Sequence, residues 1–185
     1  QGGIMGRPPT IDRDEVLDLA EDILLKGGTG ALTIDALAKA AGVSKGGIQS
    51  RFGTKNDLIA SLMRRCEEEY EAEIRTIIGE APTPVEAVRG HIRMTQNADT
   101  KSEARAASMM AALIEEREHL MTANCWYQSR FGRLDTRTSE GRRARLAFYA
   151  VEGAFILRTF GFATQADEDW EATMADILAL LDDRL

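Results

Sequence analysis

The sequence contains little cysteine and histidine, and it has no long apolar run. Its two cysteines, Cys66 and Cys125, do not form a CxxC pair, and only two histidines occur among 185 residues. This pattern excludes a disulfide framework and gives no support for a zinc site, so we expect neither metal nor cofactor. No segment approaches the roughly 20 apolar residues that span a bilayer. We therefore expect a reduced, cytoplasmic protein without a membrane partner.

Motifs of common active sites are also missing. The sequence has no GxGxxG after a strand, no GxxxxGK[ST], no HExxH and no recognisable Ser/His/Asp spacing. The glycine-rich segment 27–30 merely separates two predicted helices. We therefore expect no enzyme. A helical enzyme stays an alternative, which turnover of any substrate would support.

The charge is unevenly distributed. The net charge of −7 taken alone argues against a nucleic-acid binder, because binding to phosphates requires cations. Residues 1–65, however, hold nine Lys/Arg and eight Asp/Glu, whereas the remainder holds 14 against 22. Any DNA-binding surface is therefore expected in the first third of the chain.

Helical periodicity, broken by Gly or Pro, runs through the whole sequence without sustained period-two alternation. The pattern predicts an all-α fold. We expect the native chain to begin at Met5, because residues 1–4 resemble a tag remnant. The predicted helices run from Asp12 to near Lys26, from the caps at Thr33 and Ser44, from Thr54 past Ile77, from Thr83, and over about 102–113, 115–134, 139–160 and 167–183.

The most informative segment is residues 33–48, TIDALAKAAGVSKGGI. It predicts two short helices joined by a tight turn, the helix-turn-helix layout whose second helix enters the major groove. Ala38 allows close helix approach, Gly42 can take a left-handed conformation, and Ser44 caps the second helix. Gln pairs with adenine, and Arg or Lys with guanine or phosphate. The candidate reading residues are Ser44, Lys45, Gly46, Gly47, Gln49, Ser50 and Arg51.

Residues 12–63 resemble the DNA-binding domain of the TetR family of repressors. The segments AGVSKGGI at 41–48 and FGTKNDL at 52–58 follow that family's motif almost position by position. The resemblance implies that Thr33 and Lys55 grip phosphates, and that Lys45 lies against the groove. Gln49 and Arg51 depart from the family, which usually has Tyr and His there. Arg7 resembles part of a basic arm that some relatives lay in the minor groove.

The resemblance also implies a domain organisation. A three-helix helix-turn-helix domain, residues 5–60, is followed by a helical ligand-binding and dimerisation domain, residues 61–185. The expected function is that of a repressor. It binds a palindromic double-stranded operator as a homodimer and is released by a small apolar or amphipathic effector, which rearranges the long helix from Thr54. A helical adaptor of the same fold without specific DNA binding is the second alternative.

Candidate pocket residues lie in the second domain, because Met and aromatic side chains adapt to apolar ligands. For each of them core packing is an alternative. His91 and His119 can also hydrogen-bond a ligand, although we expect them to be partly exposed polar residues. The candidate pocket residues are Met94, Met109, Met110, Leu113, Trp126, Tyr127, Phe131, Phe148 and Phe155.

The last two predicted helices carry apolar seams suited to helix packing, and small residues at 150, 153 and 154 permit close approach. The resemblance implies that these helices form a four-helix dimer seam. An intrachain core is the alternative. The candidate interface residues are Leu146, Ala150, Gly153, Ala154, Leu157, Trp170, Met174, Ile177 and Leu181.

Overall fold

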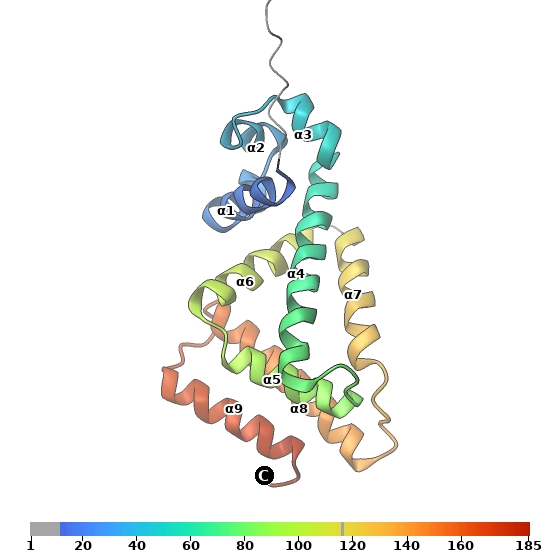
Figure 1. Ribbon diagram of the computed structural model, residues 1–185. Helices are drawn as coiled ribbons and strands as arrows, with labels where there is room; N and C mark the ends of the chain where they lie inside the picture. Colours follow the sequence, from blue (N-terminus) through green and yellow to red (C-terminus); the bar gives the residue numbers. More distant parts are fainter. Residues whose placement is uncertain (1–11, 116) are drawn as a thin grey trace, which may run out of the picture. The chain divides into compact units, whose positions relative to one another are not determined.

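The computed structural model describes residues 12–115 and 117–185, with side chains described for residues 12–114 and 119–185. Within these residues the secondary structure consists of nine α-helices and contains no β-strand, which confirms the all-α prediction (Figure 1). Two compact units are distinguished, one ending at Arg65 and one beginning at Cys66. The helices are α1 (Arg13–Ala31), α2 (Ile34–Ala40), α3 (Lys45–Phe52), α4 (Lys55–Ile78), α5 (Pro84–Gln96), α6 (Thr100–Glu115), α7 (Arg117–Phe131), α8 (Ser139–Thr159) and α9 (Asp167–Leu181).

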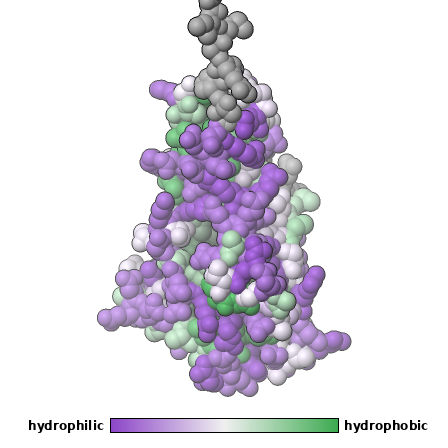
Figure 2. Space-filling view, viewed as in Figure 1, coloured by the Kyte–Doolittle hydropathy of each residue, from purple (hydrophilic) through white to green (hydrophobic). Residues whose placement is uncertain are grey.

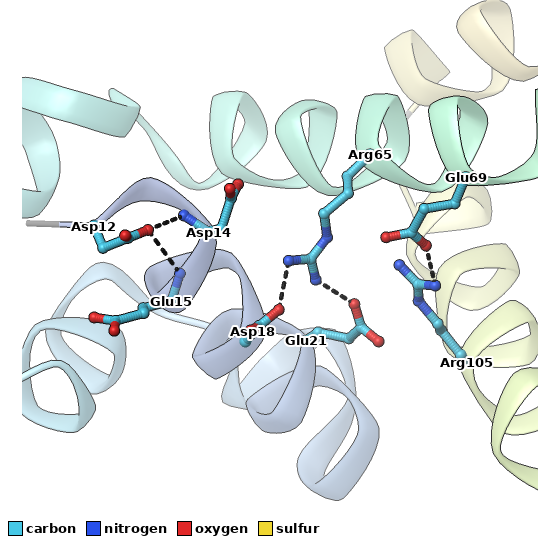
Figure 3. Close-up of polar contacts among 8 residues, drawn as sticks. All are labelled: Asp12, Asp14, Glu15, Asp18, Glu21, Arg65, Glu69 and Arg105. Carbon is cyan, nitrogen blue, oxygen red and sulfur yellow. Dashed lines mark hydrogen bonds and ion pairs between the residues drawn. The ribbon is translucent and has the colours of Figure 1, made fainter. Parts of the chain in front are cut away.

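The first unit is held together by an apolar core and by polar contacts around α1. Asp12 caps α1, and its carboxylate accepts from the amides of Asp14 and Glu15 at 2.8 and 3.3 Å (Figure 3). Arg65 of α4 bridges two carboxylates of α1, Asp18 at 2.6 Å and Glu21 at 2.5 Å. These contacts attach α1 to the first part of α4. The core side chains that are almost completely buried are Leu24, Leu32, Leu37, Ile48, Leu58, Ile59 and Leu62.

The end of α1 differs from the prediction. Helical backbone was expected to end near Lys26, but it continues to Ala31. Gly28 interrupts it with φ of 68° and ψ of −173°, a conformation that is open to glycine and strained for other residues. The glycine-rich segment therefore introduces a kink within α1 and does not terminate the helix.

In the second unit α5, α8 and α9 pack against one another, with α7 beside α5. The centre of this core is a stacked aromatic pair, Phe131 and Phe148, whose ring centroids are 4.2 Å apart. The apolar seam of α9 faces this core. Its four members are at most 6% exposed, which corrects the expectation that they face a partner chain: Trp170, Met174, Ile177 and Leu181.

Ion pairs attach the second part of α4 to its neighbours. Arg130 of α7 pairs with Glu71, and Arg105 of α6 pairs with Glu69, the latter shown in Figure 3. Both arginines are largely buried, so each pair also fixes an arginine stem against the core.

The surface is largely polar. Figure 2 shows one face of the molecule, on which hydrophilic side chains predominate and apolar ones form smaller areas. None of the described helices combines the length and apolar character that crossing a bilayer requires.

An ion pair at the end of α9 predicts an acid-sensitive contribution to stability. Asp182 pairs with Arg89 of α5 and with Arg184, and hydrogen bonds from these guanidinium groups lower its pKa from 3.8 to about 2. A lowered carboxyl pKa stabilises the fold fully above about pH 4, and this contribution is lost as the pH falls toward 2. Because solvent screens the pair, we expect Asp182→Asn to lower the free energy of unfolding at pH 7 by only about 1 kcal/mol.

Urea denaturation at pH 7 and at pH 3 tests this prediction. The deficit of the variant should shrink at the lower pH. Asp176→Asn, an exposed change of the same charge on α9, is the control and should change little. An equal deficit at both pH values would show that the ion pair is not its cause.

Candidate DNA-binding surface and ligand cavity

The turn between α2 and α3 has the geometry that the sequence predicted. The amide of Val43 donates to the carbonyl of Ala38 at 3.0 Å, and Gly42 adopts a φ of 66° that would strain any other residue. The Ser44 hydroxyl then accepts from the amide of Gly47 at 3.1 Å and caps α3. The predicted turn at Gly42 and the predicted cap at Ser44 are therefore confirmed.

Helix α3 has one buried and one exposed side. Ile48 and Phe52 are 0% and 4% exposed, so they anchor the helix in the core of the first unit. Gly47 is half-buried. The other side presents amide, hydroxyl and guanidinium groups, which match the donors and acceptors on base edges and phosphates. The exposed candidates are Ser44, Lys45, Gly46, Gln49, Ser50 and Arg51.

The predicted groove residue Lys45 and the two predicted phosphate contacts, Thr33 and Lys55, already have partners within the chain. The Lys45 ammonium is 2.9 Å from the carboxylate of Asp35, a solvent-exposed pair that is easily separated. The Thr33 hydroxyl caps α2 by accepting from an amide at 3.0 Å. Lys55 is half-buried and donates to the carbonyl of Thr29 at 2.5 Å. Its side chain therefore links the start of α4 to α1 instead of extending into solvent. Arg7 lies outside the described residues.

The start of α4 is fixed by a reciprocal capping box. The backbone amide and hydroxyl of Thr54 donate to the carboxylate of Asp57, and these bonds lower its pKa. The Asp57 amide donates back to the Thr54 hydroxyl at 3.2 Å, which completes the capping box. The chain therefore leaves α3 and enters α4 through a locally determined connection.

The second unit contains a cavity of about 230 Å³. Helices α4 to α8 all contribute to its wall. Most of the wall is aromatic or aliphatic, with a few polar side chains, as is usual for small-molecule sites. The lining residues are Tyr70, His91, Met94, Thr95, Ala98, Ser102, Ala106, Met110, Trp126, Tyr127, Val151, Glu152 and Phe155.

The structure brings five of the nine candidate pocket residues together. Met94, Met110, Trp126, Tyr127 and Phe155 all line the cavity. The other four do not line it, which corrects their assignment. Met109, Phe131 and Phe148 are buried, and Leu113 is half-buried.

The polar wall of the cavity was not predicted. Tyr70, His91 and Glu152 come from α4, α5 and α8, and they are joined by hydrogen bonds of 3.0 and 2.7 Å. His119 is 3% exposed, so the expectation that it is partly exposed is wrong, whereas the side chain of His91 is 12% exposed. Their spacing in the sequence does not indicate that Tyr70, His91 and Glu152 lie close together, because they belong to three different helices.

One side of α8 forms an apolar surface on the second unit. Leu146 and Leu157 are 53% and 47% exposed, and Tyr149 is 63% exposed. Between them Gly153 leaves open space, because an added Cβ atom would meet no atom within 4 Å. The candidates on α8 therefore lie on one accessible helix surface, with Ala150 and Ala154 half-buried.

Two family profiles match the chain. Residues 16–62 match the profile described as "Bacterial regulatory proteins, tetR family". Residues 85–182, more than half of the chain, match "Tetracyclin repressor-like, C-terminal domain". No curated protein sequence matches at a significant level.

Several solved structures share the fold along most of the chain. The multidrug binding protein EbrR, in complex with malachite green, is 21% identical, with a TM-score of 0.69 and coverage of 92% of this chain and 98% of that one. A transcriptional regulator from Rhodococcus is 20% identical, with a TM-score of 0.64 and coverage of 93% and 97%. A cysteine mutant of the TetR family regulator CifR, in complex with 26-base-pair operator DNA, is 19% identical, with a TM-score of 0.54 and coverage of 96% and 98%.

Proposed function

The chain belongs to the TetR family of bacterial regulatory proteins, and we propose that it is a repressor that binds a palindromic operator as a dimer and is released by a small molecule. The observation that carries this proposal is the exposed side of α3. Gln49 and Arg51 extend into solvent from a helix that is capped, anchored and preceded by a fixed turn. Such a rigid helix can hold side chains at base edges.

The apolar side of α8 supports dimerisation. Leu146, Tyr149 and Leu157 are large, exposed and close to small residues, a combination that permits close packing against a second copy. Two copies related by a twofold axis present two reading helices, and a palindromic operator has the same symmetry.

The cavity supports control by a small molecule. EbrR binds malachite green and CifR binds operator DNA, and this chain shares their fold. Tyr70 lines the cavity from α4, the helix that follows α3 in the chain. We infer that an occupied cavity favours an arrangement of α4 in which the two reading helices no longer match the operator.

Selection of bound duplexes from a random DNA library tests the DNA-binding part of this proposal. The purified protein should enrich one sequence with two inverted half-sites, whose centres lie about one helical turn or more apart. The salt concentration is kept fixed, because phosphate contacts make affinity depend on salt. A folded protein that enriches no sequence would contradict the proposal and favour the adaptor alternative.

A further inference from the structure

A continuous chain of hydrogen bonds crosses the wall of the cavity. The Tyr70 hydroxyl lies 3.0 Å from Nδ1 of His91, and Nε2 of that ring lies 2.7 Å from Oε1 of Glu152. The Tyr127 hydroxyl donates to Oε2 of Glu152 at 2.9 Å. All four side chains line the cavity. His91 and Tyr127 therefore hold a single carboxylate in place, and Tyr70 fixes the His91 ring.

The direction of this chain follows from which groups keep their protons. Burial raises the pKa of the Tyr70 and Tyr127 hydroxyls far above the usual range, so both remain protonated. A Tyr70 hydroxyl that donates to Nδ1 of His91 leaves Nε2 of that ring to donate to Glu152. The Glu152 carboxylate then accepts two hydrogen bonds, one from His91 and one from Tyr127.

None of the residues that line the cavity is a lysine or an arginine. The guanidinium of Arg130 lies 4.2 Å from the centroid of the Trp126 ring and 5.7 Å from that of the Tyr70 ring, and it is already paired with Glu71. Glu152 is the one carboxylate among the lining residues, and it lies in a mostly apolar wall, where Coulomb attraction is stronger than in water.

The remaining walls suit a positively charged aromatic guest. Tyr70, Tyr127, Trp126 and Phe155 supply ring surfaces, which attract cations through their quadrupoles. Arg130 already lies over the Trp126 and Tyr70 rings, so the rings of Tyr127 and Phe155 are more available. The volume of about 230 Å³ lies below the roughly 300–1,000 Å³ of common small-molecule sites, which favours a compact guest.

We propose that this cavity binds a compact aromatic monocation, with the Glu152 carboxylate as its counter-charge. This inference rests on the proposed function only in taking the cavity as the effector site. It predicts discrimination by charge among molecules of one shape. An anion would be repelled by Glu152, and a neutral guest would gain only the apolar contacts.

Three bicyclic probes of nearly equal size test the proposal. They are N-methylquinolinium, the neutral 1-methylnaphthalene and the anion 1-naphthoate. Calorimetry on the unaltered protein should show the cation binding at least about tenfold more tightly than the neutral probe, and the anion binding most weakly. Equal affinity for cation and neutral probe would overturn the proposal, as would preference for the anion or no cation binding at all.

Two matched variants locate the charge that matters. Glu152→Gln should weaken binding of N-methylquinolinium about 10- to 100-fold and leave 1-methylnaphthalene nearly unchanged. Glu140→Gln removes the same charge from an exposed position of α8 and should bind both probes as the unaltered protein does. Equal loss in both variants, or loss in neither, would overturn the assignment to Glu152. If Glu152→Gln does not fold, the three-probe comparison on the unaltered protein still decides.

The inference and the proposed function fail separately. Cation binding in a protein that enriches no DNA sequence would support the cavity assignment and contradict the regulator. Sequence-specific DNA binding in a protein that binds no cation would do the reverse.

Discussion

Replacing Gln49 and Arg51 together by alanine is expected to weaken binding to the selected duplex by about 100-fold or more. Each side chain that pairs well with a base edge contributes about 1–3 kcal/mol of discrimination. Both are exposed on α3, whereas Ile48 and Phe52 anchor that helix on its other side. The fold should therefore be unaffected. Fluorescence anisotropy with a labelled duplex measures the affinity, and the melting temperature checks the fold.

Lys26→Ala is the control for the charge that Arg51 contributes. Lys26 is exposed near the end of α1 and pairs only with Asp22 among its described contacts. Its removal should change operator affinity by far less than the double variant does. A double variant that binds as tightly as the unaltered protein would show that α3 does not read the operator.

If the chain dimerises through α8 as proposed, the double variant Leu146→Glu/Leu157→Glu is expected to be a monomer. These side chains lie on the apolar side of α8, where a close partner would bury two charges on each chain without compensation. The dissociation constant of the dimer should rise at least about 100-fold, because residues at the centre of an interface carry most of its energy. Operator affinity should fall as well, because a monomer binds only one half-site at a time.

Sedimentation equilibrium measures this change directly. Met121→Glu, at a residue that is 66% exposed on α7, controls for placing a charge on an exposed apolar position. It should leave the dimer intact. If the α8 variant remains a dimer, the interface lies elsewhere on the chain.

Features determined by neighbouring residues could be predicted from the sequence. The caps at Thr33, Ser44 and Thr83 each depend on a side chain within three residues of the amide it accepts from. The turn at Gly42 depends on one backbone conformation. Such local signals were sufficient for the helix-turn-helix and for the all-α fold.

Features determined by distant residues could not be predicted. The seam of α9 has the spacing of a helix-packing surface, and periodicity does not tell whether the neighbouring helix belongs to the same chain. In the structure α5 and α8 cover it. The same limit applies to the cavity, where residues 70, 91 and 152 meet only because three helices pack together.

Selection from the random DNA library, repeated with Gln49→Lys, tests whether α3 reads bases. Glutamine favours adenine and lysine favours guanine, because their hydrogen-bonding groups match different base edges. We expect the enriched site to change at one symmetric position in each half-site and to be retained elsewhere. An unchanged site, bound with a merely altered affinity, would contradict this expectation, because residue 49 would then contact no base.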